Sequence, residues 1–320
     1  MATQGSKVVI YAALGGNALI AATKFAAAAF TGSAAMLSEA IHSTVDTFNQ
    51  LLLLHGIRRA ARAPTPQHPF GHGLELYFWA FVVAILIFGL GAGISILEGL
   101  DKIANPHPIE NAYVNYAVLG LGILFEGAAW FLAYREFRRA EGRLSLVGAI
   151  HRSKDPTLFM VLFEDTAALL GLATAILGIA LGQELNLPVL DGVASVIIGL
   201  ILAVTAGFLA FECQSLLKGE AVDPQVRDSI CAIAVGQHGV MRLNEALTMH
   251  FGPQDVLVAL SLDFDDAILA GEVETAVTEI ERRIKEAHPE VTRVFIEAQS
   301  FAAHRRGQAA QAPDVALQEP

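Results

Sequence analysis

Long apolar runs separated by short polar connections fill the first two thirds of the chain. Each run is close to or above the roughly 20 residues that a helix needs to cross the apolar core of a bilayer. The runs cover residues 8–30, 34–57, 74–100, 113–134, 157–182 and 190–217. The pattern predicts six transmembrane helices that form an all-α membrane domain over residues 1–219.

The pattern changes period at Asp223. Signals for a helix, two alternating strands, an amphipathic helix and a further strand follow one another. They cover residues 223–235, 241–250, 256–264, 271–287 and 292–298. This αββαβ order predicts a small ferredoxin-like α/β domain over residues 220–300, with both helices on one face of the sheet. Residues 301–320, which contain Gln-Ala repeats and two prolines, are predicted to be a disordered tail.

Composition agrees with a membrane protein that has an acidic soluble part. Hydrophobic residues make up 54% of the chain, and the mean hydropathy is +0.50, above the usual range of soluble domains. The net charge of −11 is uneven, because residues 1–219 hold 13 basic and 15 acidic side chains and residues 220–320 hold 8 and 17. An acidic soluble part argues against nucleic acid as a partner.

Basic residues are concentrated in alternate connections of the membrane domain. These residues are Lys7, Arg58, Arg59, Arg62, Arg135, Arg138, Arg139, Arg143, Arg152, Lys154 and Lys218. The opposite connections contain only Lys102. Since positive connections stay in the cytoplasm, both termini are predicted to be cytoplasmic. The expected location is a bacterial inner membrane, with an organelle membrane as the alternative.

Titratable residues inside the second apolar run indicate where the chemistry lies. His42 and Asp46 are four residues apart, so in a helix they share one face and can hold one divalent metal ion. Titratable side chains are costly in a lipid-embedded segment and usually line an ion or substrate pathway. The alternative is a polar pair that ties two helices together.

A second acidic cluster, Glu164 and Asp165, lies in the fifth apolar run with no basic residue near it in that run. A bound cation would balance these charges. His42, Asp46 and Asp165 together offer one imidazole and two carboxylates, a set that suits zinc, and Glu164 is the best candidate for a fourth contact. No organic cofactor is expected.

Several motifs together resemble the cation diffusion facilitator family. They are the His42-x-x-x-Asp46 pair, the loop His68-Pro69-Phe70-Gly71-His72-Gly73, the fifth-run Asp165 with Gly171 six residues later, and the αββαβ region. The resemblance covers about residues 8–300. It implies a homodimer that exports or sequesters a divalent metal by exchange with protons, through a site shared by the second and fifth spans.

The chain departs from the family pattern at the fifth span. The family usually has two ligands there, four residues apart, and the earlier position is Val161 in this chain. Glu164, water and Asn49 are therefore the alternatives for the fourth ligand. Glu126, a lone acid in the fourth span, is either a proton relay or vestibule residue or a hydrogen-bonding partner of a neighbouring helix.

The family's second site also differs. His68 and His72 match a metal site at the entrance of the third span, but its accompanying acidic positions are Thr65 and Pro66 here. The expectation is a weak second site or a structural role for these histidines.

The soluble domain lacks the family's zinc ligands. The corresponding positions are Asn244, Ser261, Glu297 and Gln299. A binuclear zinc centre is therefore not expected, and His250 with Glu297 is the pair that could form a weaker site. The domain is predicted to dimerise without metal.

The sequence thus predicts a metal/proton antiporter that works by alternating access, with Zn²⁺ as substrate and Mn²⁺, Fe²⁺ or Co²⁺ as alternatives. The rival functions are a membrane metal sensor or scaffold that does not transport and an intramembrane metalloenzyme. The sequence does not support the metalloenzyme hypothesis, because it contains no His-Glu-x-x-His motif and no nucleophile beside the site.

Overall fold

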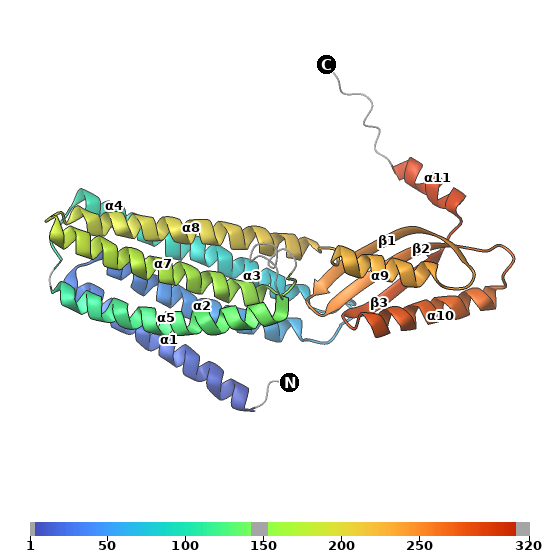
Figure 1. Cartoon of the computed structure of the whole chain (residues 1–320), viewed down its shortest axis with the longest axis horizontal. Helices are drawn as coiled ribbons and strands as arrows, with labels where there is room; N and C mark the ends of the chain where they lie inside the picture. Colours follow the sequence, from blue (N-terminus) through green and yellow to red (C-terminus); the bar gives the residue numbers. More distant parts are fainter. Residues whose placement is uncertain (1–3, 110, 142–152, 312–320) are drawn as a thin grey trace, which may run out of the picture. The chain divides into compact units, whose positions relative to one another are not determined.

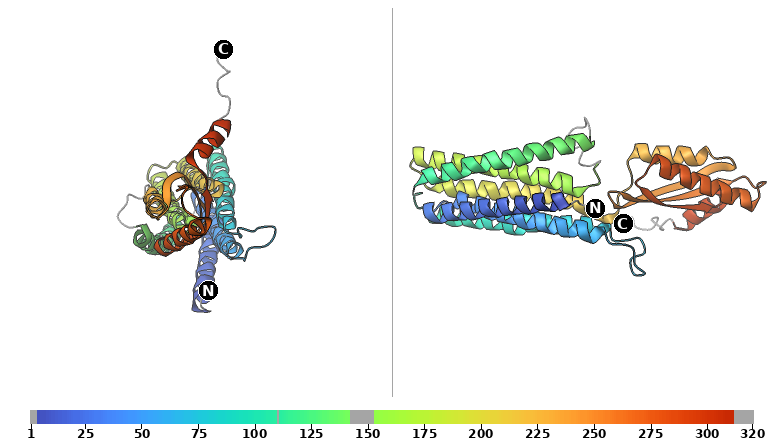
Figure 2. Two further views of the ribbon diagram at one scale, coloured as in Figure 1. Left: turned by 90° about the vertical axis from the view of Figure 1, so that its right-hand side faces the viewer. Right: turned by 90° about the horizontal axis from the view of Figure 1, so that it is seen from below.

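The computed structural model describes residues 4–109, 111–141 and 153–311. The chain divides into two compact units, Met1–Leu217 and Lys218–Pro320 (Figure 1). The helical segments of the first unit are α1 (Gln4–Thr31), α2 (Ala34–Ala60), α3 (Leu74–Leu86), η1 (Ile87–Ala92), α4 (Gly93–Ala104), α5 (Ala112–Glu141), α7 (Pro156–Glu184) and α8 (Val189–Lys218). Helices α2 to α8 run side by side along the unit, and α1 slants away from them towards its N-terminus (Figure 1 and Figure 2). Residues 142–152 of the basic connection lie outside the described residues.

Four helical stretches of the described chain are long and apolar enough to cross a membrane. They are Leu74–Ala104, Ala112–Arg135, Phe159–Glu184 and Val189–Lys218. Their outward side chains are apolar, as Leu97, Leu124 and Val204 show with exposed fractions of 67%, 70% and 74%, which is the pattern of a lipid-facing surface. Helices α1 and α2 form where the first two spans were predicted.

The third apolar run is one continuous stretch with an irregular middle. Six residues, Ile87–Ala92, adopt π-helical geometry between α3 and α4. Glycines at positions 89, 91 and 93 favour such a change because they weaken the regular helix. The sequence predicted an uninterrupted helix here, and the π segment is the correction.

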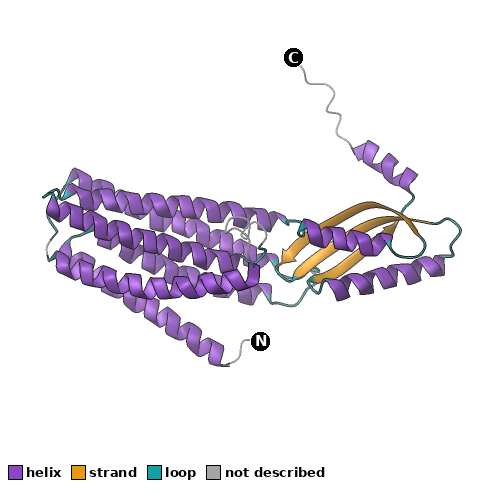
Figure 3. Cartoon of the chain, viewed as in Figure 1, coloured by secondary structure: helices purple, strands orange, loops and turns teal. Residues whose placement is uncertain are grey.

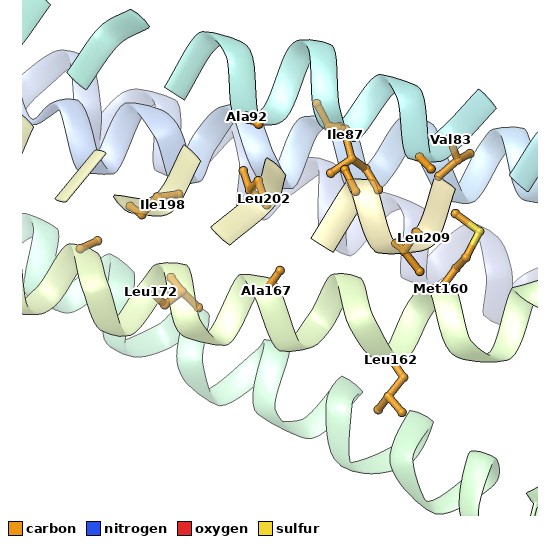
Figure 4. Close-up of a cluster of buried hydrophobic side chains, with 14 of the residues drawn as sticks. Val83, Ile87, Ala92, Met160, Leu162, Ala167, Leu172, Ile198, Leu202 and Leu209 are labelled. Carbon is orange, nitrogen blue, oxygen red and sulfur yellow. The ribbon is translucent and has the colours of Figure 1, made fainter. Parts of the chain in front are cut away.

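Close backbone contacts join α4 to α8. A Cβ atom placed on Gly99 would lie 2.7 Å from the Gly192 carbonyl oxygen, and one on Gly192 would lie 2.8 Å from the Gly99 carbonyl oxygen. Small residues allow this approach, which is how membrane helices associate without a hydrophobic driving force between them. Buried apolar side chains from α3, η1, α7 and α8 fill the interior nearby (Figure 4).

The second unit has the predicted αββαβ order (Figure 3). Its elements are α9 (Pro224–Val235), β1 (Val240–Gly252), β2 (Asp255–Phe264), α10 (Ala270–Ala287) and β3 (Val291–Ala298). Strand β2 is central, antiparallel to β1 and parallel to β3. Alternate β2 residues, from Val256 to Leu262, form one core with Ile230 of α9 and Ile280 of α10. Because alternate residues share a face, both helices cover the same face of the sheet.

The predicted disordered tail is wrong for its first half. Residues Phe301–Gln311 form helix α11, and residues 312–320 lie outside the described residues. The Phe301 ring contacts the Arg242 guanidinium, 4.1 Å from the ring centroid, and its backbone N–H donates to Asp263 at 3.1 Å. These two contacts hold the start of α11 against β1 and β2, which composition alone does not indicate.

Candidate metal site

A buried carboxylate from α8 fixes the start of α2. Asp191 accepts hydrogen bonds from the Ser33 hydroxyl at 2.6 Å and from the Ala34 backbone N–H at 2.7 Å. The Lys102 ammonium lies 3.8 Å from the same carboxylate, and neither charged residue is more than 4% exposed. Because the first N–H groups of a helix lack partners within it, Asp191 and Ser33 together cap α2. This cap positions the helix that carries His42 and Asp46.

His42 and Asp46 lie one turn apart on α2, as their spacing requires. His42 Nδ1 is 3.4 Å from Asp46 Oδ1, and His42 is only 1% exposed. Neither ring nitrogen of His42 has a hydrogen-bond partner among the described residues, and the same holds for Asp46 Oδ1. Buried polar atoms without partners are uncommon and costly. Their concentration on this turn is what a binding site for a cation would produce.

An internal cavity of about 20 Å³ lies beside Asp46. That volume holds one water molecule or one ion. Three helices contribute carboxylates to its wall: Asp46 from α2, Glu126 from α5, and Glu164 and Asp165 from α7. The remaining wall residues are Asn17, Ile20, Ser43, Gln50 and Val161. Four acids around so small a space need a bound cation or bound protons to offset their mutual repulsion.

Glu164 takes part in a second contact between α2 and α7. Its carboxylate accepts a hydrogen bond from Asn49 Nδ2 at 3.0 Å, and Glu164 is 5% exposed. Asn49 Oδ1 and Asp165 Oδ2 are buried without a partner among the described residues. Two of the three alternatives for the fourth ligand, Glu164 and Asn49, are therefore hydrogen-bonded to each other.

The ligand set is not closed in this conformation. Within the described part of the chain, no three His, Cys, Asp or Glu side chains come close enough together to hold a metal ion. Asp46, Glu164 and Asp165 line one cavity, whereas His42 is not among its wall residues. Side-chain rotation would be needed to bring the imidazole and the carboxylates onto one ion.

Comparison with known proteins decides the family. A model of the cation efflux transmembrane domain matches residues 10–217, more than half of the chain. This chain belongs to the cation diffusion facilitator family. Members of this family are transporters rather than enzymes, so the metalloenzyme hypothesis is set aside.

Relatives of this cation diffusion facilitator differ in metal. The human mitochondrial proton-coupled zinc antiporter SLC30A9 is 32% identical over 83% of this chain and 47% of its own length. The manganese efflux system protein MneP of Bacillus subtilis is 25% identical over 93% of this chain and 97% of its own. The cation-efflux pump FieF of Shewanella oneidensis is 24% identical over 81% and 82%. The chain thus spans about half the length of the SLC30A9 proteins.

The entrance histidines of this cation diffusion facilitator are close together, and the acid nearest to them along the chain is paired with other side chains. The His68 and His72 rings have centroids 4.6 Å apart, in the loop before α3. Glu75, the nearest acid along the chain, accepts instead from the Arg59 guanidinium at 2.6 Å and from Trp79 Nε1 at 3.0 Å. Two imidazoles whose neighbouring carboxylate is already paired make an incomplete metal site.

Neutral side chains occupy three of the four soluble-domain positions where the family places zinc ligands, and Glu297 occupies the fourth. Asn244 Nδ2 donates to the Gln299 carbonyl oxygen at 2.7 Å and lies 3.4 Å from the Ser261 hydroxyl. The weaker pair expected here, His250 with Glu297, is wrong. His250 is opposite Val256 and Glu297 is opposite Ser261 on the central strand, five residues apart. An odd separation puts the two side chains on opposite faces of the sheet.

A charged residue beside the site was missed in the sequence. Lys24 lies in the first apolar run, is fully buried, and donates to Glu39 at 3.2 Å and to the Ser43 hydroxyl at 2.7 Å. The sequence does contain a signal for this residue, since a lysine inside an apolar run requires a buried partner. Lys102 was also misassigned as a connection residue, since it is buried in α4 beside Asp191.

Proposed function

We propose that this protein is a divalent-metal/proton antiporter of the cation diffusion facilitator family, with Zn²⁺ as its substrate. The observation that carries the proposal is the cavity between α2, α5 and α7, where four carboxylates meet next to the unpartnered imidazole of His42. We assign His42, Asp46 and Asp165 as ligands and Glu164 as the fourth, after it releases Asn49.

Proton coupling follows from the chemistry of these ligands. Imidazole and carboxylates bind a metal ion only when deprotonated, so metal binding releases protons and protonation releases metal. If the cavity opens alternately to the two sides of the membrane, the two fluxes are coupled in opposite directions. The SLC30A9 relatives, described as proton-coupled zinc antiporters, agree with this mechanism.

Flux measurements in proteoliposomes test the proposal. Zinc uptake should rise when a pH gradient of the favourable sign is imposed. Asp46→Ala and Asp165→Ala should each abolish uptake at normal expression, because each removes both a ligand and a charge. Glu184→Ala is the matched control on α7, where Glu184 is exposed at the helix end, and it should transport normally. Tight zinc binding with no flux in the parent protein would instead identify a sensor or scaffold.

The choice of zinc over manganese rests on His42. Imidazole favours zinc, whereas an all-oxygen set suits manganese, the metal named for the relative MneP. His42→Asp should therefore keep metal binding but move the Zn²⁺/Mn²⁺ preference towards Mn²⁺. Competition calorimetry on the purified variant measures that ratio, and an unchanged ratio would remove His42 from the ligand set.

We further propose that six helices, α1 and α2 included, cross the membrane with both termini in the cytoplasm, and that the protein acts as a homodimer. The uncovered face of the soluble sheet supports dimerisation, because Leu247 and Phe295 are 59% and 56% exposed on it. A bacterial inner membrane and an organelle membrane both remain consistent with the relatives, among which SLC30A9 is mitochondrial. Cysteine accessibility at residues near each terminus tests the orientation.

A further inference from the structure

Lys24 joins α1 to α2 by two hydrogen bonds one helical turn apart. Its ammonium group lies 2.7 Å from Ser43 Oγ and 3.2 Å from Glu39 Oε2. Lys24 and Glu39 are both 0% exposed, and Ser43 is 4% exposed. A fully buried lysine stays charged only beside a counter-charge, which Glu39 supplies.

The ion pair is oriented with its positive end towards the metal cavity. Ser43, which accepts from Lys24, forms part of the cavity wall next to Asp46. Glu39 lies one turn further along α2 and is not among the wall residues that the structure describes. Ser43 therefore links the ammonium to the cavity wall, whereas Glu39 does not line that wall among the described residues. In a low-dielectric interior this arrangement opposes the entry of a second cation.

A transporter has a physical reason to include such a charge. Four carboxylates around about 20 Å³ would hold a divalent ion strongly, and a substrate that is bound too tightly is released slowly. A fixed positive charge outside the ligand shell weakens binding without removing a ligand. Because this charge belongs to a side chain of α1, it stays in place when the metal ion is released.

We propose that Lys24 is an affinity-setting residue of the transport site: a tethered cation that weakens metal binding so that the ion can be released. This inference rests on the proposed transport function, since it concerns the same cavity. The competing explanation is that Lys24 only docks α1 against α2. An affinity-setting role predicts that substitutions of Lys24 and Glu39 change zinc affinity in opposite directions. A docking role predicts that both substitutions change it in the same direction.

The test uses the purified full-length protein and Zn²⁺ titration by calorimetry. Lys24→Met removes the cation and should tighten zinc binding by about tenfold, or about 1.4 kcal/mol. Glu39→Gln leaves the ammonium uncompensated and should weaken binding by a similar factor. If Lys24 only docks the helices, both substitutions loosen the site and shift affinity in the same direction, and that result would overturn the proposal.

Two further variants keep the test decisive. The double variant Lys24→Met/Glu39→Gln buries no charge, so it folds even if a single variant does not, and it should still bind zinc more tightly than the parent. Parent-like affinity in the double variant would refute the tethered-cation role. Thr31→Val is the control for α1 docking, because it removes an uncharged buried bond from Thr31 to Asn115 of α5 at 2.9 Å. Its zinc affinity should stay within twofold of the parent.

Transport supplies a separate readout. In proteoliposomes Lys24→Met should lower both the KM for zinc and the maximal rate, because tighter binding slows release. A raised KM, or an unchanged maximal rate, would contradict the inference. Absence of zinc flux in the parent protein would refute the proposed function alone, since the affinity comparison is made without transport.

Discussion

The Asp191–Lys102 pair allows a quantitative prediction about what holds α2 in place. Asp191→Ala removes the Asp191 part of the α2 cap, its hydrogen bonds from the Ser33 hydroxyl and the Ala34 N–H, which is worth about 1 kcal/mol. It also leaves Lys102, 4% exposed, without its counter-charge and with only the Gly32 carbonyl and the His107 ring as partners, and a buried charge that loses its partner charge costs about 3–5 kcal/mol. The total loss of about 4–6 kcal/mol corresponds to a fall in Tm of about 10 °C or more for a unit of this size.

Thermal unfolding of the full-length protein in detergent, followed by tryptophan fluorescence, measures this loss. The matched control is Lys102→Met/Asp191→Leu, which loses the Asp191 part of the cap but buries no charge. Its free energy of unfolding should fall by only about 1–2 kcal/mol. The single variant should therefore be clearly less stable than the double variant. Equal stability of the two would show that the ion pair does not stabilise the start of α2.

Three further outcomes test the remaining assignments. Glu164→Gln should weaken zinc binding by about tenfold, about 1.4 kcal/mol, if Glu164 releases Asn49 and binds the metal. Unchanged affinity in calorimetry would leave water or Asn49 as the fourth contact. His68→Ala with His72→Ala should lower zinc flux only modestly, because no acid completes that site, and a complete loss in a folded protein would contradict this. The isolated unit 218–311 should remain dimeric in chelator by light scattering, and dissociation on chelation would show that metal is required.

The sequence predicts helices and strands well where the pattern of apolar residues alone determines them. The apolar runs and the αββαβ order follow from hydrophobic periodicity, which local sequence carries. The π segment at Ile87–Ala92 was not predictable in the same way, because Gly89, Gly91 and Gly93 are equally compatible with a regular membrane helix. Helix α11 was missed because its start depends on contacts with Arg242 and Asp263, far away in the sequence.

The candidate site was predictable in part. The spacing of His42 and Asp46 places them on one face of any helix. The acids of α7 indicate a functional site because they lie in an apolar run, where such residues are costly. The role of Lys24 depends on which helix packs against α1, and a single sequence does not contain that information. The error at His250 and Glu297 has a similar cause, because strand register, with shifts near Leu243 and His250, determines the face.

The Lys24–Glu39 ion pair also bears on how the chain enters a bilayer. A charged residue at the centre of a lone helix raises the cost of insertion by about 2.5–3.5 kcal/mol, and the cost is smaller towards the helix ends. Lys24 lies seven residues before the end of α1, and Glu39 lies five residues after the start of α2. Under the six-span proposal, α1 and α2 each carry one half of a pair that is neutral only when both are present. The turn between them is two residues long. Inserting α1 and α2 together as a hairpin would let the two charges neutralise each other in the lipid, whereas inserting either helix alone would leave its charge unpaired.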